Sequence, residues 1–326
     1  MTFFDILKFV GGVAIFLFGM TVMGEGLEKR SAGKLKLTLE RLTASPLKAL
    51  FLGLGVTAII QSSSATTVML VGFVNSGVMT LSQTIGVIMG ANIGTTVTGW
   101  LLSLAGIKGS NFFLQLLKPS SFSPIFAAIG IIMFLSKNSK RRDTGSVLIG
   151  FAVLMNGMEI MSSAVSALKN SEQFGNIMVM FSNPILGVLL GALVTAIIQS
   201  SSASVGILQA LSSTGKLSYM TVVPIVLGQN IGTCVTALLS AIGTNKNAKR
   251  VAAVHLLFNI IGSLLFLFVF FIVKQNLLIL TKTANGFGIA IVHTIFNVFA
   301  TVILFPFSKT LEKLAYHFVP EHIKGM

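Results

Sequence analysis

The feature that most constrains this chain is a polar run inside an apolar segment, Gln61-Ser62-Ser63-Ser64-Ala65-Thr66-Thr67. A similar run, Gln199-Ser200-Ser201-Ser202-Ala203-Ser204, follows 138 residues later. Of the 326 residues, 53% are apolar and only 10% are charged, which is outside the range of soluble domains. We therefore expect an all-α polytopic membrane protein. Because polar groups inside hydrocarbon are costly unless they line a site, the repeated run is a candidate functional site.

The charge pattern fits this class. The formal net charge is +14, but Lys and Arg cluster between apolar segments, as residues that set membrane topology do. No nucleic-acid partner is expected, because no motif that reads nucleic acid accompanies the charge. The single cysteine, Cys234, excludes an intramolecular disulfide framework and a cysteine-based metal cluster. The first apolar run is preceded by Asp5 and lacks a cleavage site, which predicts a retained membrane span.

Helix length predicts a re-entrant hairpin around the first polar run. The segment Pro46 to Ile60 would be about 22 Å long as a helix, too short for a hydrocarbon core of about 30 Å. The apolar pattern resumes at Ser64 and continues to about Gly77. Two short helices joined by a polar tip would enter and leave on the same face. One continuous spanning helix remains the alternative, because buried irregular backbone needs protein cover.

The next span, about 81–104, contains the motif Gly90-Ala91-Asn92-Ile93-Gly94-Thr95-Thr96. Two glycines around an asparagine predict a place where this helix unwinds. The same order returns 138 residues later, with a hairpin at about 184–214 and a broken helix at about 219–242. Alignment without a gap over about 80 residues indicates duplication.

The predicted organisation is a first repeat, 1–140, a second repeat, 141–275, and an additional span with a cytoplasmic tail, 276–326. If each hairpin enters and leaves the membrane on the same face, the first repeat crosses the membrane three times. Because this number is odd, the second repeat is inverted relative to the first. With the N-terminus outside, the cytoplasmic loops are 29–48, 137–142, 246–250 and 309–324. These loops hold 16 of the 23 Lys and Arg residues. Because basic residues favour the inside, we expect a multi-pass plasma-membrane protein with a cytoplasmic C-terminus. Full spans in place of the hairpins would leave 15 of these residues inside and would place the 137–142 cluster outside.

Each tip has the chemistry of an ion site. A helix N-terminus presents free N–H groups and a positive dipole end, which favour an anion. Serine hydroxyls and glutamine amides both donate and accept hydrogen bonds. Carbonyl oxygens at the other end of the break suit a hard cation such as Na⁺. Inverted repeats would bring both tips to the midplane, where we expect only neutral ligands, so that anion and cation binding are coupled.

Other polar residues in the spans have two interpretations each. Glu159, the only acidic residue well inside a span, is either a coupling residue or a hydrogen-bonded structural one. Two His-x-x-Phe-Asn segments place His255 with Asn259 and His293 with Asn297. We favour a structural role, in which the histidine donates to a backbone carbonyl and the asparagine ties helices together. The glycines between 86 and 99 predict close packing, except where they flank Asn92.

These motifs resemble the sodium-dependent phosphate cotransporter family, meaning the Na/Pi type II group and its bacterial relatives. The resemblance rests on both Gln-Ser-Ser-Ser runs and on Gly-x-Asn-Ile-Gly-Thr at 90–95 and 228–233. It implies a phosphate site formed by Gln61, Ser62, Ser63, Ser64, Gln199, Ser200, Ser201 and Ser202. It also implies Na⁺ binding, for which the candidate ligands are Gln61, Ser64, Thr66, Asn92, Thr95, Gln199, Ser202, Asn230 and Thr233.

The implied function is a non-enzymatic symporter that moves inorganic phosphate inward with Na⁺ by alternating access, without another cofactor. Departures from the family pattern are Cys234 where the first copy has Thr96, Gln229 where it has Ala91, and a first repeat without His-x-x-Phe-Asn. The PhoU-like domain of some bacterial relatives is expected to be absent. A homodimer stays open.

Two other functions compete with the symporter. An intramembrane serine hydrolase would use a hairpin serine with His255 or His293 as base. It is disfavoured because the serines are duplicated and no Gly-x-Ser-x-Gly motif is present. A passive anion channel is the remaining alternative.

Overall fold

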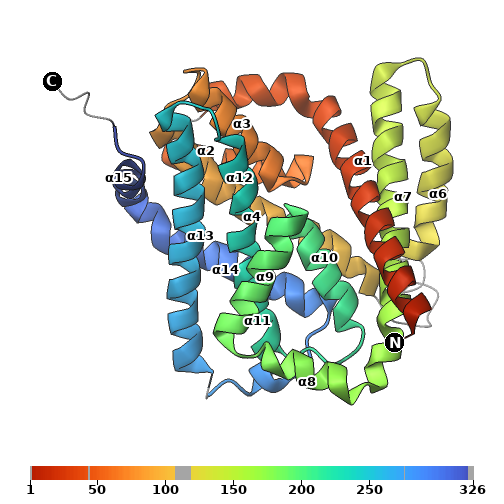
Figure 1. Ribbon diagram of the computed structural model, residues 1–326. Helices are drawn as coiled ribbons and strands as arrows, with labels where there is room; N and C mark the ends of the chain where they lie inside the picture. Colours follow the sequence, from red (N-terminus) through yellow and green to blue (C-terminus); the bar gives the residue numbers. More distant parts are fainter. Residues whose placement is uncertain (1, 43–44, 107–118, 275, 322–326) are drawn as a thin grey trace.

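Figure 1 shows helices in every part of the chain that the computed structural model describes, residues 2–42, 45–106, 119–274 and 276–321. No strand occurs among these residues, although an isolated antiparallel bridge joins Ser218 to Thr283. Six helices are long and apolar enough to cross a membrane, or up to seven if a bent pair counts as one span. The expected all-α polytopic membrane protein is therefore confirmed.

The helix bounds define the elements used below. The longer helices are α1 Phe3–Leu42, α4 Leu81–Ser103, α7 Ser139–Val165, α13 Lys246–Val273 and α14 Gly286–Leu304. The shorter ones are α2 Pro46–Ile60, α3 Ser63–Asn75, α6 Pro119–Phe134, α8 Glu172–Met180, α9 Pro184–Ile198, α10 Ser201–Ser212, α11 Tyr219–Gly232, α12 Cys234–Ser240 and α15 Ser308–Phe318.

The first polar run lies between α2 and α3, where the chain turns back on itself. Pro46 occupies the first turn of α2, where its missing N–H costs no hydrogen bond. Gln61 ends that helix in the left-handed region, with φ 62°. The hydroxyls of Thr57 and Thr66 lie 2.9 Å apart across the hairpin. The continuous helix left open by the sequence is therefore not formed, whereas re-entry into a bilayer stays a prediction.

Glycines explain why α2 follows α4 so closely. A Cβ atom at Gly90 would overlap the Leu50 carbonyl, and one at Gly94 would meet the Leu54 carbonyl. The same contacts recur in the second half, where Gly228 lies against the Val188 carbonyl of α9. The first residues of α9, α10 and α11 lie 138 positions after those of α2, α3 and α4. Both short pairs therefore pack by the same backbone-to-backbone contact.

The break that the sequence predicts in the span at about 81–104 is wrong. Helix α4 runs without interruption through Gly90 to Thr96. The side chains of Asn92 and Thr95 bond to carbonyls one turn earlier, Ile88 and Ala91, so they complete the helix surface. The flanking glycines serve close packing against α2 and do not unwind the chain. In the second copy Thr233 lies between α11 and α12, but its φ of −63° and ψ of −21° are helical and its N–H donates to the Gln229 carbonyl, so that helix is not unwound either.

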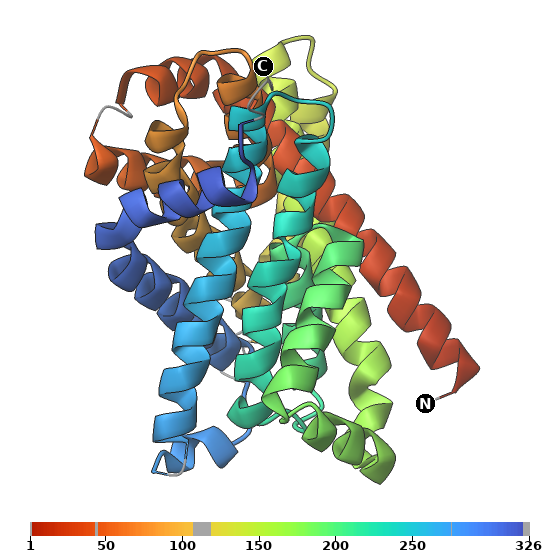
Figure 2. The same ribbon diagram turned by 60° about the vertical axis from the view of Figure 1, so that its left-hand side comes forward.

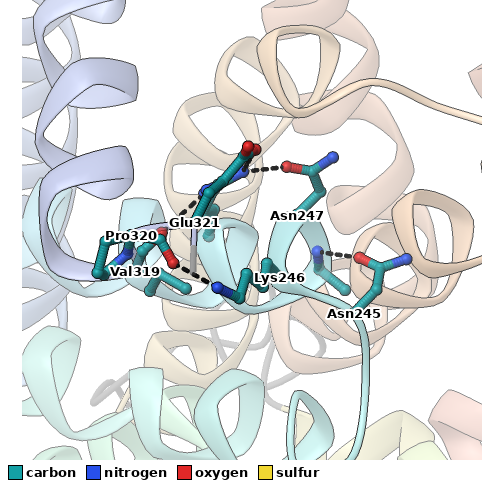
Figure 3. A network of polar contacts seen from close by, with 8 residues as sticks. Asn245, Lys246, Asn247, Val319, Pro320 and Glu321 are labelled. Atoms are coloured by element: carbon teal, nitrogen blue, oxygen red, sulfur yellow. Dashed lines mark hydrogen bonds and ion pairs between the residues drawn. The ribbon is translucent and has the colours of Figure 1, made fainter. Parts of the chain in front are cut away.

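The helix ends gather at two faces. At one, Asn245 before α13 donates its backbone N–H to Asn75 Oδ1 after α3, over 2.9 Å. Beside it, Lys246 Nζ donates to the Pro320 carbonyl over 2.7 Å, so the end of the described chain joins the same face (Figure 3). We call this end of the molecule the basic face, since the α6–α7 turn with Lys137 lies there too (Figure 1).

The opposite face holds the N-terminus, α8 and the turns before α11 and α14. Lys8 near the N-terminus donates to Ser163 Oγ near the end of α7, and Tyr219 N donates to the Lys282 carbonyl. In both views α15 lies in the upper part of the molecule and the start of α1 in the lower part (Figures 1 and 2). Helix α4 thus runs from the basic face to the opposite face, while α11 and α12 run back.

Buried apolar side chains form two clusters. The smaller one joins α1 and α7, with Phe16, Leu154 and Met161 fully buried. A Cβ atom at Gly19 of α1 would overlap the backbone of Leu154, so these two helices pack at glycine distance. The larger cluster includes residues of α2 to α4, α11, α13 and α14. The candidate site lies where α1 of the smaller cluster meets the hairpins.

Candidate functional site

Each tip is built from a left-handed glutamine followed by a capping serine. Gln61 and Gln199 have φ 62° and 60°, and the N–H of each donates to a threonine carbonyl at the end of the preceding helix. Ser62 Oγ then accepts from the N–H of Ala65 over 3.1 Å, and Ser200 Oγ accepts from Ala203 over 3.2 Å. One serine of each run is therefore engaged as a helix N-cap.

Both tips open onto one cavity of about 430 Å³. Seven of the eight residues predicted to bind phosphate line it, namely Gln61, Ser62, Ser63, Ser64, Ser200, Ser201 and Ser202. The eighth, Gln199, is exposed, but its carbonyl oxygen accepts hydrogen bonds from Ser64 Oγ and Thr236 Oγ1, both over 3.2 Å. Tips separated by 138 residues in sequence thus meet through a direct hydrogen bond.

Helix α1 forms the remaining wall of the cavity. Its lining residues recur at helical spacing and are Leu17, Met20, Thr21, Gly24, Glu25 and Glu28. The expectation that only neutral ligands surround the site is therefore wrong. The carboxylate of Glu25 pairs with exposed Lys29 over 3.2 Å, and Glu28 has no ion pair among the described residues. The sequence pattern placed both glutamates at the interfacial end of the first span, where nothing linked them to the tips.

The predicted Na⁺ ligands divide into two groups. Gln61, Ser64 and Ser202 line the cavity. Thr66 is buried behind the first tip, where its hydroxyl also donates to the Ser62 carbonyl. The buried side chains of Asn92, Thr95, Asn230 and Thr233 are not among those that line the cavity. Asn230 donates to the Val226 carbonyl of its own helix over 2.9 Å, as Asn92 does in its copy.

The buried hydroxyls that have no partner within the described part of the chain include Thr195 Oγ1, Ser204 Oγ and Thr233 Oγ1. Thr195 lies against Gly232, which directly precedes Thr233. Their counterparts Thr57 and Thr66 bond each other in the first half. Unpartnered hydroxyl oxygens are groups that can bind Na⁺. Thr195 and Ser204 were not predicted as Na⁺ ligands, although they lie 138 residues after Thr57 and Thr66.

Glu159 and the histidines lie away from the cavity. Glu159 is exposed on α7, and neither it nor His255 nor His293 is among the lining residues. The ring nitrogens of His293 are buried without a partner in the described structure, so its predicted bond to a carbonyl is absent. The asparagines bond mainly within their own helices, Asn259 to the His255 carbonyl and Asn297 to the His293 carbonyl.

The first repeat lacks a His-x-x-Phe-Asn segment of its own, but the fold places one beside it. Asn259 of α13 donates to Cys234 Sγ of α12 over 3.4 Å, so the first His-x-x-Phe-Asn segment packs beside the second-half motif. Helix α14 instead packs on α4, where His293 lies beside Gly99 and Trp100 Nε1 donates to Thr294 Oγ1 over 3.0 Å. Each copy of the Asn-Ile-Gly-Thr helix therefore has one such segment beside it.

Comparison with known proteins gives a consistent result. The family model described as Na⁺/Pi-cotransporter matches residues 15–163 and 154–293. The "Uncharacterized protein YqeW" of Bacillus subtilis is 29% identical, over 97% of this chain and 98% of its own length. The "Putative inorganic phosphate export protein YjbB" of Salmonella typhimurium is 28% identical over 98% of this chain, which spans only 58% of that relative.

A human relative shares a shorter region. The "Sodium-dependent phosphate transport protein 2B" of Homo sapiens is 34% identical over 40% of this chain and 22% of its own length. No solved structure matches the chain.

Proposed function

The chain belongs to the Na⁺/Pi-cotransporter family, and on this basis we propose that it is a secondary active symporter coupling Na⁺ movement to uptake of inorganic phosphate. The observation that carries the proposal is the shared cavity, which seven of the eight predicted phosphate residues line. Helix N-termini and serine hydroxyls at both tips supply donors for an oxyanion. The only co-transported ion or cofactor in the proposal is Na⁺.

In the proposed site, phosphate lies between the tips, and Na⁺ is held by oxygens behind them. Support for the cation position comes from the unpartnered hydroxyls of Thr195, Ser204 and Thr233. A bound Na⁺ near the tips would offset the charge of phosphate, because no Lys or Arg lines the cavity. Each ion then raises the affinity for the other by the same factor.

We further propose that the two halves are inverted repeats and that alternating access exposes the cavity to each face in turn. The opposite directions of α4 and of α11 with α12 support this relation. The N-terminus would lie outside and the C-terminus in the cytoplasm of a plasma membrane, because the basic face carries most of the Lys and Arg. A homodimer is compatible with the proposal but is not required by it.

Outward transport is the second candidate direction. The printed name of the Salmonella relative, an inorganic phosphate export protein, favours it. A coupled transporter moves its substrates down their combined gradients, so the same site serves either direction. The direction of phosphate transport is therefore set by the ion gradients and by the alternating-access cycle, and not by the cavity.

The experiment is transport by the purified full chain in sealed vesicles. We expect labelled phosphate to accumulate against its gradient when Na⁺ is higher outside, and not when choline replaces Na⁺. Preloaded vesicles with Na⁺ higher inside test efflux in the same preparation. Na⁺-independent accumulation would sink the coupling, and downhill flux without accumulation would identify a channel. Competition by arsenate and sulfate would define which oxyanions the site accepts.

A serine hydrolase is tested separately. The histidines that such an enzyme would need are not among the residues that line the cavity with the serines. We therefore expect no labelling by a serine-directed fluorophosphonate. Covalent labelling at Ser63 or Ser201 would revive that reading.

A further inference from the structure

A narrow apolar groove of about 280 Å³ lies between α11, α13 and α14, away from the proposed transport cavity. Its walls are Tyr219, Val223, Phe266, Val269, Phe270, Val273, Leu277, Ile279, Leu280, Ile291, Val292 and Ile295. Tyr219 contributes the only side chain with a polar atom. No acidic or basic residue lines the groove, so neither a cation nor a phosphate ion has a charged ligand there.

The groove lies toward the opposite face of the molecule. Helix α11 begins at Tyr219, α13 ends at Val273 and α14 begins at Gly286, so three helix ends border it. Its outer rim is open, because Leu277, Ile279 and Ile291 are exposed. Neighbouring exposed side chains on α13, such as Phe268 and Ile272, mark this side as facing hydrocarbon.

Two lysines lie at the interfacial end of the groove. Lys274 directly follows the lining residue Val273, and its Nζ lies 4.5 Å from the centre of the Phe271 ring. Lys282 is exposed, and its carbonyl accepts from the N–H of the lining residue Tyr219. A lysine can extend its ammonium group to the headgroup layer while its stem follows apolar surface.

Charge and shape together define the occupant. Inside a bilayer there is no hydrophobic force to recruit a second apolar surface, because lipid tails are as apolar as leucine. An acyl chain still gains dispersion contacts with the apolar walls of the groove. Basic residues at the membrane end of the groove add an attraction for an anionic headgroup. A second protein chain would instead need a broad complementary surface.

The geometry points to a phospholipid site, in which one acyl chain fills the groove and the headgroup phosphate lies beside Lys274 and Lys282. The bound lipid connects α11, which packs on the second hairpin, with α13 and α14. The site stands independently of the transport function proposed above, since none of its residues lines the transport cavity.

The test uses the purified full chain, stripped of lipid in detergent and titrated with phosphatidylglycerol or phosphatidylcholine of identical acyl chains. Native mass spectrometry counts the lipids retained per chain. We expect one retained phosphatidylglycerol and a preference over phosphatidylcholine. Lys274→Gln and Lys282→Gln should each lower phosphatidylglycerol affinity about fivefold, with little effect on phosphatidylcholine. Lys169→Gln, an exposed lysine on the same face, is the matched control.

A second variant tests the acyl-chain position. Val292→Phe places a larger side chain in the groove and should lower the affinity for both lipids, while its thermal unfolding reports whether packing is preserved. Absence of a retained lipid overturns the proposal. An unchanged lipid preference in both Lys274→Gln and Lys282→Gln also overturns it, as does a groove occupied by a second copy that is cross-linked at Ile291. If Val292→Phe does not fold, the lysine variants alone decide.

Discussion

At the scale of single residues, the two glutamines that begin the polar runs have a backbone role. Both Gln61 and Gln199 adopt a left-handed conformation, and they are the only non-glycine residues with positive φ in the described chain. This conformation costs a non-glycine residue about 1–2 kcal/mol. The left-handed glutamine turns the chain, and the serines that follow it line the cavity. A strained residue next to a candidate site supports a functional reason for its side chain.

Ser201 gives the sharpest residue-scale prediction. Its side chain is buried in the second tip and lines the cavity. Under the symport proposal, Ser201→Ala removes a hydrogen bond to a charged ligand, which contributes about 1.5–3 kcal/mol. We expect the phosphate KM and the Na⁺ concentration for half-maximal uptake to rise together, by about tenfold or more. Uptake assays over both ion concentrations measure this.

The control for Ser201 is Ser166→Ala, an exposed serine after α7 that bonds the Ser163 carbonyl. It should leave both constants unchanged. If Ser201→Ala also leaves both constants unchanged, the site assignment is wrong. A lower maximal rate with normal constants would instead indicate loss of folded protein.

Removing the charge of Glu28 should change the affinities for Na⁺ and for phosphate in opposite directions. Its carboxylate lines the cavity without an ion pair among the described residues, so it attracts Na⁺ and repels phosphate. Glu28→Gln should weaken Na⁺ dependence and strengthen phosphate binding, each by a few-fold. The effect should shrink as ionic strength rises, because exposed charges are screened within about 10 Å at 0.1 M salt.

Uptake at two ionic strengths, adjusted with choline chloride, measures the Glu28 effect. Glu172→Gln on α8 removes an equal charge at the opposite face and should change neither constant. A parallel loss of both affinities in Glu28→Gln would contradict the electrostatic account and indicate a structural role.

At the scale of elements, glycine contacts decide how each hairpin is held. Gly90 of α4 lies on the carbonyl of Leu50 in α2, and Gly228 lies on Val188 in α9. Such contacts allow backbones to approach closely, which is how membrane helices pack without a hydrophobic force. The hairpins are consequently attached along one side to a full-length helix, and their tips project toward each other.

Gly90→Ala tests this packing. The added methyl group would overlap the Leu50 carbonyl, which is backbone and cannot move aside without shifting α2. We expect a loss of about 1–3 kcal/mol, seen as a lower thermal unfolding temperature in detergent. Gly72→Ala on α3 is the matched control, because nothing lies within 4 Å of its added Cβ atom. That control should be neutral or slightly stabilising, since alanine favours the helix; equal loss in both variants would contradict the packing account.

At the scale of the whole molecule, the two faces differ in charge. The basic face joins the turns after α3 and α12 with the C-terminal segment, through Asn75, Asn245 and Lys246. Arg250 is 1% exposed there, with Nε donating to the Val319 carbonyl and its guanidinium 3.8 Å from the centre of the Tyr316 ring. These bonds hold α15 and the residues after it against the start of α13.

Single-cysteine labelling tests the orientation of these faces. The native Cys234 is 0% exposed, so background labelling by a membrane-impermeant thiol reagent should be low. Lys137→Cys on the basic face should react only from the cytoplasmic side, and Lys169→Cys on the opposite face only from outside. The reverse pattern would invert the proposed topology, and labelling of both from one side would disprove it.

Much of this molecule could be predicted from residue order alone. Helix lengths, the two short pairs around polar tips and the 138-residue offset follow from hydrophobic pattern and repetition, which are local properties. The expected break at Asn92 was wrong because the glycines around it can either unwind a helix or admit a neighbour. Their sequence cannot say which, since the answer depends on Leu50 and Leu54 of another helix.

Only the tertiary structure decided what surrounds the tips. It brought Ser64 to the Gln199 carbonyl and α1 with Glu25 and Glu28 to the same cavity. It also placed the two His-x-x-Phe-Asn segments beside different halves. These are contacts between segments far apart in the chain, and they depend on how helices pack. The sequence by itself determined which groups can bind an anion and a cation, because that follows from side-chain chemistry and helix ends.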